Sequence, residues 1–270
     1  MLSRVSNKVA ELDFTIKKYK KLCKTISASN YEILTVENYI SKKEKPNKFI
    51  ILRHDVDIKP ERALEFAKVE SMFNIQSTYY FRMTPKVFIP TIIKEIATLG
   101  HEIGYHYEVL DKARGDYKKA IIIFESELNK LREIVDIKTI CMHGNPLTKW
   151  RNIDVWNYYD FTKFGIIGEA YLSINYEDIA YFSDTGRTWD GGKYRIKDVV
   201  CSKVTGFFNI KSTDELIRLI RKEEVEKMCI LSHPGQWTDD YWSWITIWLV
   251  RKTKNKIKST ILRRVHKLWK

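Results

Sequence analysis

The stretch KFIILRHDVDI, residues 48–58, decides how the rest of the chain is interpreted. Its apolar first half predicts a short strand, and three polar residues lie at the end of that strand: His54, Asp55 and Asp57. Successive side chains of a strand point to opposite faces, so the two aspartates face the same way. Two carboxylates on one face repel each other unless a cation lies between them or one keeps its proton. The structural alternative, a cap for the helix that Pro60 opens, requires only one aspartate.

Predicted strands and helices alternate along most of the chain. Apolar runs of strand length occupy residues 48–54, 77–83, 102–106, 138–142, 178–182 and 227–232. One helix-like pattern begins at Pro60, and others cover residues 90–99, 112–135 and 213–223. Such alternation is typical of a parallel sheet, which is either open or closed into a barrel.

The composition indicates a globular protein in a reducing compartment. The 270 residues suffice for one large domain or two small ones, and 44% of them are hydrophobic. The four cysteines lie far apart and form no CxxC pair: Cys23, Cys141, Cys201 and Cys229. No apolar leader opens the sequence and no run is long enough to span a membrane, so we expect a cytoplasmic protein.

The positive charge is concentrated at the C-terminus. Residues 251–270 contain nine lysines or arginines and no acid, whereas the remainder has 38 basic and 34 acidic residues. A nearly balanced body does not favour nucleic-acid binding. Six apolar residues of the tail follow helical spacing: Ile257, Ile261, Leu262, Val265, Leu268 and Trp269. This pattern predicts a helix on an anionic membrane surface, with a solvated basic helix or an RNA-contacting tail as alternatives.

Four of the six histidines stand at or just after predicted strand ends: His54, His106, His143 and His233. In parallel α/β folds, ligands and catalytic groups gather at the carboxyl ends of the strands. A single histidine there is commonly structural, but four in separate strand units, together with two aspartates, are hard to explain as independent structural residues. Histidine and carboxylate ligands suit zinc or a similar divalent ion that keeps a water in an open position.

Three motifs resemble those of a known family. GHEIGYH, residues 100–106, resembles the second motif of the polysaccharide deacetylases, the NodB-homology or carbohydrate esterase 4 group. RHDVD, residues 53–57, resembles a divergent first motif, and LSHPGQW, residues 231–237, resembles the fifth. The order of the three motifs matches that family over residues 45–237.

The resemblance implies a distorted parallel (β/α) barrel of NodB type. We expect this deacetylase-like domain to occupy residues 46–240. A helical extension in residues 1–45 precedes it, and an aromatic and basic amphipathic helix in residues 241–270 follows it.

The resemblance also assigns roles to individual residues. It places the catalytic base at Asp55 and a metal ligand at Asp57, and the inserted Val56 leaves an exchange of these two roles open. His106 matches the first metal histidine of the second motif, and His233 matches the general acid of the fifth.

Three departures from the family pattern leave alternatives. The second metal histidine belongs four residues after His106, where this chain has Leu110. We expect His143, at the next strand end, to replace it, and Glu108 is the second choice. The third motif is not recognisable, and its arginine, which orients the base, has three candidate counterparts: Arg53, Arg82 and Arg151. In the region of the fourth motif, the resemblance leads us to expect that either Asp184 or Asp190 orients the acid and that Trp189 forms a wall of the sugar site.

The resemblance implies a metal-dependent hydrolase, with zinc as the expected ion, that deacetylates an N-acetylated sugar. Together with the basic tail, it leads us to expect a role in surface-polysaccharide or lipopolysaccharide biosynthesis, with peripheral attachment to the inner membrane face. We expect no nucleic-acid partner. A hydrolase of another C–N amide bond and a catalytically silent sugar-binding protein with the same fold remain as alternatives.

Overall fold

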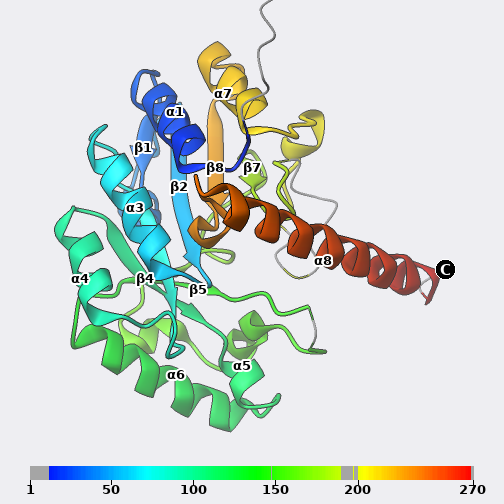
Figure 1. Cartoon of the computed structure of the whole chain (residues 1–270). Helices are drawn as coiled ribbons and strands as arrows, with labels where there is room; N and C mark the ends of the chain where they lie inside the picture. Colours follow the sequence, from blue (N-terminus) through cyan, green and yellow to red (C-terminus); the bar gives the residue numbers. More distant parts are fainter. Residues whose placement is uncertain (1–11, 147, 190–196, 198–199, 269–270) are drawn as a thin grey trace, which may run out of the picture.

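The computed structural model describes residues 12–146, 148–189, 197 and 200–268 (Figure 1). This part of the chain contains one sheet of eight strands, in the order β6-β5-β4-β3-β2-β8-β7, with β1 beside the first half of β2. Every pairing in it is parallel. The strands are β1 (Glu32–Leu34), β2 (Phe49–Val56), β3 (Thr78–Arg82), β4 (Glu102–Tyr107), β5 (Thr139–Met142), β6 (Gly168–Glu169), β7 (Ala180–Ser183) and β8 (Lys227–Ser232).

Helices alternate with these strands. They are α1 (Ile16–Ser27), α2 (Val36–Ser41), α3 (Pro60–Ser71), α4 (Pro90–Thr98), α5 (Val109–Lys112), α6 (Tyr117–Arg132), α7 (Thr213–Lys222) and α8 (Tyr241–Leu268). Short 3₁₀ helices cover Asn152–Asn157, Phe161–Phe164, Thr205–Phe207 and Pro234–Gln236.

Strand β2 lies at the centre, and all eight of its side chains are buried. Its alternate residues Ile50 and Leu52 belong to the core between the sheet and the helices that cover its outer face. The intervening Ile51 belongs to a second cluster on the inner face, together with Tyr80 and Cys141 from neighbouring strands. A strand covered on both faces is almost continuously apolar, which explains why this stretch was recognisable from the sequence.

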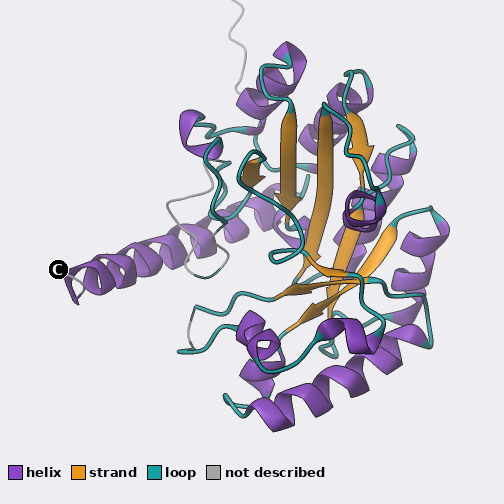
Figure 2. Ribbon diagram, turned by 180° about the vertical axis from the view of Figure 1, so that it is seen from behind, coloured by secondary structure: helices purple, strands orange, loops and turns teal. Residues whose placement is uncertain are grey.

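The sheet curls into a half-barrel with helices around its outer side (Figures 1 and 2). Strands β6 and β7 end the pairing order, so within the described residues the barrel stays open between them. The predicted fold class, a distorted parallel (β/α) barrel, is confirmed, and the predicted strands and helices agree with the observed ones to within a few residues.

Two segments differ from the prediction. The helix expected over 112–135 begins only at Tyr117, as α6. The short helix α5 precedes it, and between the two is a turn at Gly115, whose φ of 86° lies in the left-handed region that favours glycine. The segment expected to be only a helical extension, residues 1–45, also supplies strand β1, which pairs with β2. This part of the chain therefore belongs to the sheet as well as to the helical layer.

The C-terminal helix α8 leaves the body and extends away from it (Figure 1). No helix in the described ranges has enough consecutive apolar residues to cross a membrane.

Candidate metal centre and catalytic groups

The candidate site lies at the carboxyl ends of the parallel strands. Asp55 is the seventh residue of β2 and Asp57 follows that strand; His106 lies near the end of β4, and His143 follows β5. On the other side of β2, His233 follows β8. Because parallel strands end at one edge of the sheet, side chains from distant parts of the sequence meet there.

A carboxylate oxygen lies between two imidazoles. Asp57 Oδ1 is 3.5 Å from His106 Nε2 and 3.6 Å from His143 Nε2. This oxygen is buried and accepts no hydrogen bond. Two ligands on a tetrahedral zinc ion with bonds of about 2.1 Å lie about 3.4 Å apart, so each of the two separations from Asp57 fits a pair of ligands on one ion. Asp57 is therefore close to both of the histidines that were predicted to bind the metal with it.

The orientation of His106 also suits a ligand. Its Nδ1–H donates to the carbonyl oxygen of Cys141 at 3.0 Å, which turns Nε2 toward the two aspartates. A backbone acceptor on the other ring nitrogen is the usual way in which proteins fix the tautomer of a metal-binding histidine. Burial lowers the pKa of His106, but Asp55 and Asp57 outweigh it and raise the pKa. A cation or a proton is thus favoured at this nitrogen.

The charges at Asp57 and His143 are also those that a metal requires. Burial raises the pKa of Asp57, but the neighbouring histidines outweigh burial and hold it well below its usual range, so the carboxylate is ionised. Burial lowers the pKa of His143, which favours the neutral imidazole. An ionised carboxylate and a neutral imidazole are the metal-binding forms of these groups.

Asp55 is held by a buried arginine. Arg53 Nη2 donates to both oxygens of Asp55, at 3.1 and 3.0 Å. The same nitrogen lies 3.0 Å from Cys141 Sγ and 3.2 Å from Tyr171 Oη, so the guanidinium is fixed inside the barrel. The second oxygen of Asp55 is 3.8 Å from His106 Nε2, which places this carboxylate directly beside the candidate metal position.

His233 is paired with Asp184 on the opposite side. Its Nδ1 is 2.5 Å from Asp184 Oδ1, and its backbone N–H donates to Asp184 Oδ2 at 2.9 Å. Trp237 Nε1 donates to the same Oδ2 at 2.7 Å. Burial lowers the pKa of His233, but Asp184 first, and then Asp57 and Asp55, outweigh it and raise the pKa to about 9. The imidazole is therefore protonated at neutral pH, as a general acid has to be.

Among the described residues, two groups of donors have ligand atoms that all lie within 4.8 Å of one another, and Asp57 belongs to neither group. Cys141 accompanies Asp55 and His106 in one of them, and Asp111 accompanies Glu108 and His143 in the other. In the first group, Asp55 and Cys141 both contact the Arg53 guanidinium, which already neutralises the carboxylate.

The second group is occupied by other partners. Glu108 is ion-paired with Arg82 at 2.5 Å. Asp111 accepts hydrogen bonds from three donors: Thr148 Oγ1, Trp150 Nε1 and Asn152 Nδ2. These carboxylates have structural roles, so Glu108 is less suitable than His143 as the third ligand.

Some predicted site residues lie elsewhere. Trp189 is fully buried, stacks on Phe14 and donates to Thr213 at 3.1 Å, so its ring belongs to the core and does not line a sugar site. Asp190, the alternative partner of His233, lies outside the described residues. Arg151 is exposed at the start of a 3₁₀ helix, in contrast to the buried Arg53.

His54 also has a structural position. It points to the helix-covered face of the sheet, where its Nε2 is 2.8 Å from the fully buried Glu70. Glu70 also accepts hydrogen bonds from Tyr19, from Tyr79 at 2.6 Å and from Ser77 at 2.7 Å. This network lies on the helix-covered face of the sheet and was not predicted from the sequence.

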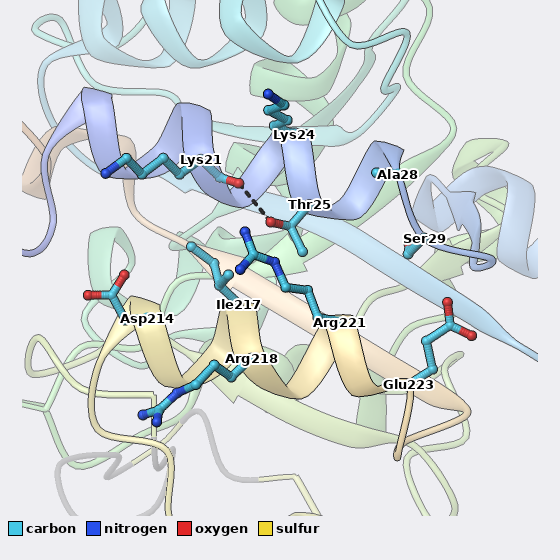
Figure 3. Close-up of a pocket in the computed structure, with 10 residues that line it drawn as sticks. All are labelled: Lys21, Lys24, Thr25, Ala28, Ser29, Asp214, Ile217, Arg218, Arg221 and Glu223. Carbon is cyan, nitrogen blue, oxygen red and sulfur yellow. Dashed lines mark hydrogen bonds between the residues drawn. The ribbon is translucent and has the colours of Figure 1, made fainter.

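A surface pocket of about 620 Å³ lies away from these residues, between α1 and α7 (Figure 3). Lys24 and Arg218 extend away from the space between the two helices, and Arg221 extends into it. The basic side chains of this pocket therefore do not converge on one ligand position.

Comparisons with known proteins give limited similarity. No family model and no curated protein matches the chain. Among solved structures, a CE4 family pseudoenzyme from Bacillus anthracis is 13% identical, with a TM-score of 0.39 over 80% of this chain and 63% of the other. A mutant of that pseudoenzyme, described as having restored enzymatic activity, is 14% identical, with a TM-score of 0.39 over 80% of this chain and 65% of the other. This chain thus spans just under two thirds of their length.

Proposed function

We propose that this protein is a metal-dependent hydrolase that deacetylates an N-acetylated sugar in surface-polysaccharide or lipopolysaccharide biosynthesis. The observation that carries the proposal is the position of Asp57 Oδ1 between His106 Nε2 and His143 Nε2, at 3.5 and 3.6 Å. The sugar substrate and the pathway are supported by the motif resemblance in residues 45–237 and by the basic tail.

Asp57, His106 and His143 would hold the ion, and zinc suits their donor set. When bound, such an ion polarises an amide carbonyl and lowers the pKa of a coordinated water toward about 7. Asp57 and His143 are the more accessible members of the group, at 24% and 18% exposure, so the site is open to solvent on their side.

The remaining groups supply proton transfer. Asp55, fixed by Arg53, is placed to accept a proton from water beside His106. His233, protonated through its pairing with Asp184, is placed to give a proton to the leaving amine. The acid and the base come from different strands, β8 and β2, so they can act on opposite sides of a bound amide.

The experiment combines metal analysis with an acetate-release assay on N-acetyl sugars. The wild-type protein should retain about one zinc ion per chain, and Asp57→Asn should lose it. Asp55→Asn should keep the ion and lose turnover, and His233→Ala should keep it with a turnover number about 10² to 10⁴ lower. Loss of the ion in Asp55→Asn but not in Asp57→Asn would show that the two carboxylates have the opposite roles.

Two outcomes would replace the proposal. Stoichiometric metal without acetate release, but with hydrolysis of other amides, would indicate a different C–N substrate. Wild-type protein that binds N-acetyl sugars but retains neither metal nor turnover would be a silent sugar-binding protein.

A further inference from the structure

Helix α8 contacts the body through the face that carries Trp244 and Asn255. Trp244 Nε1 donates to the carbonyl oxygen of Asp13 at 2.7 Å, and the Arg187 guanidinium lies 4.7 Å from the centre of the Trp244 ring. Three turns further along the same face of the helix, Asn255 Nδ2 donates to the carbonyl oxygen of Gly186 at 3.0 Å. These contacts fix which side of the helix faces the protein.

A different face of α8, exposed except at the half-buried Ile245, changes from apolar to basic along its length. Tyr241, Ile245, Leu249, Lys252 and Lys256 follow one another at intervals of four, four, three and four residues, which places them on one stripe of the helix. Tyr241 and Leu249 are 54% and 53% exposed. Trp242, beside the stripe, is 74% exposed, so large apolar side chains face water here.

We infer that this stripe, Tyr241 to Lys256 with Trp242, binds the surface of an anionic lipid bilayer. Tryptophan and tyrosine prefer the boundary between headgroups and acyl chains, and lysine and arginine are attracted to anionic headgroups. The partner has to be negatively charged, because the sequence from residue 251 to 270 contains nine basic residues and no acid.

The other occupants fit this face less well. A second copy would bring the same uncompensated positive charge against itself, which opposes association. An RNA would neutralise the lysines but would leave Leu249 and much of the Trp242 ring in contact with water or phosphate. Only a membrane surface offers anionic groups and an apolar layer side by side.

The start of α8 connects this surface with the candidate site. His233 lies eight residues before Tyr241, at the carboxyl end of β8, so the helix leaves from the end of the barrel that holds the site (Figure 1). The turn from Asp184 to Arg187 holds His233 at one end and contacts Trp244 at the other. An acetylated sugar carried on a membrane lipid would reach the site at that end; this consequence rests on the proposed function, whereas the membrane surface does not.

The test is sedimentation of the full-length protein with vesicles of phosphatidylcholine alone or mixed with phosphatidylglycerol. We expect binding to the mixed vesicles that is reduced, but not abolished, by high salt, because the apolar part of the stripe is not screened. The double variant Lys252→Gln and Lys256→Gln should bind about 30-fold more weakly, the effect of two basic residues at an anionic surface. Trp242→Ser should bind at least about tenfold more weakly, because it removes apolar area from the interface.

Matched controls share exposure and charge but lie elsewhere. Lys118→Gln with Lys119→Gln removes the same charge from α6, where both side chains are exposed. Phe207→Ser removes a large apolar side chain that is 82% exposed. Both should bind the vesicles like the wild type, and thermal unfolding should show all of these proteins equally folded.

The conservative variant Trp242→Phe gives a second measurement. Brominated lipids in the mixed vesicles should quench less of its tryptophan fluorescence than in the wild type, because the ring predicted to enter the lipid no longer fluoresces. Equal binding by the stripe variants and the controls would overturn the inference, and so would unchanged quenching in Trp242→Phe. RNA binding or self-association that is lost only in the stripe variants, without vesicle binding, would assign the surface to that partner instead. The acetate-release assay on a soluble sugar is read separately, so failure of the proposed hydrolase leaves this result intact.

Discussion

The substitution Asp184→Asn tests the electrostatics of the candidate acid without any assumption about the substrate. Burial disfavours the charged form of His233, yet pairing with Asp184 helps to raise its pKa from 6.5 to about 9. That rise corresponds to about 3 kcal/mol of preference for the charged imidazole. Asp184 is the largest of the groups that raise it, so removing its charge should lower the pKa of His233 by about 2 units or more.

The assay is an NMR titration of the histidine ring nitrogens in metal-free protein. At pH 7.5 nearly all of His233 should be protonated in the wild type, but only about one tenth in the variant if its pKa returns to about 6.5. Asp178→Asn is the matched control, because Asp178 is an exposed aspartate paired with Lys227 and should leave His233 unchanged. A wild-type pKa below 7, or a change of less than about one unit in Asp184→Asn, would refute the reasoning.

The same pair makes stability depend on pH. Because the folded pKa of His233 lies above the unfolded value, its stabilising contribution is complete below pH 6.5 and is lost as the pH rises through about 9. The pKa of Asp184 is lowered in the folded state, so its contribution is present above its ordinary value of 3.8 and is lost as the pH falls below it. Both statements describe the same ion pair, so this pair stabilises the fold most between pH 3.8 and pH 6.5.

Two further substitutions test the scaffold. Glu70→Gln should lower the free energy of unfolding in urea titrations by about 3 to 5 kcal/mol, because it leaves His54 and three hydroxyl donors without their carboxylate. As the control, Glu65→Gln in an exposed ion pair should change the free energy of unfolding by less than about 0.5 kcal/mol. Because the folded pKa of Glu70 is about 2 against an ordinary 4.5, the difference between wild type and Glu70→Gln should shrink as the pH falls through that interval. Gly104→Ala should cost about 2 to 3 kcal/mol, since its Cβ would overlap the Tyr80 ring, and Gly206→Ala, with no heavy atom within 4 Å, should cost far less.

The sequence predicted the parts of the fold whose burial leaves a periodic signal. Strand β2 was visible as an apolar run because both of its faces are covered. The period of two also predicted that Asp55 and Asp57 share a face, and both lie beside His106 Nε2. The same alternation would have placed His54 on the opposite face, which is where the structure has it.

Other features had no comparable signal. Strand β1 has three residues and pairs only with β2, so it is too short to show a period. The partners that fix Arg53 lie 88 and 118 residues away in sequence, at Cys141 and Tyr171, and only the curled sheet brings them together. The buried Glu70 follows Ala63, Phe66 and Ala67 at helical spacing. This spacing predicts that Glu70 is buried, but it does not predict which residues Glu70 contacts.

The departure at Leu110 is consistent with the geometry of neighbouring parallel strands. Leu110 is buried in α5, and its backbone N–H donates to Asn152 Oδ1 at 2.9 Å, so this position serves the core. Strands β4 and β5 pair directly, and adjacent strands lie about 4.8 Å apart. The rings of His106 and His143, at the ends of these two strands, are 5.4 Å apart and nearly perpendicular. An imidazole from the neighbouring strand β5 can therefore reach the space beside Asp57. In the deacetylase motif that this chain resembles, the corresponding histidine stands four residues after the position of His106. If His143 has taken over this role, His143→Ala should weaken zinc binding, and Leu110→His in that background should not restore it, because the Leu110 side chain is enclosed in the core.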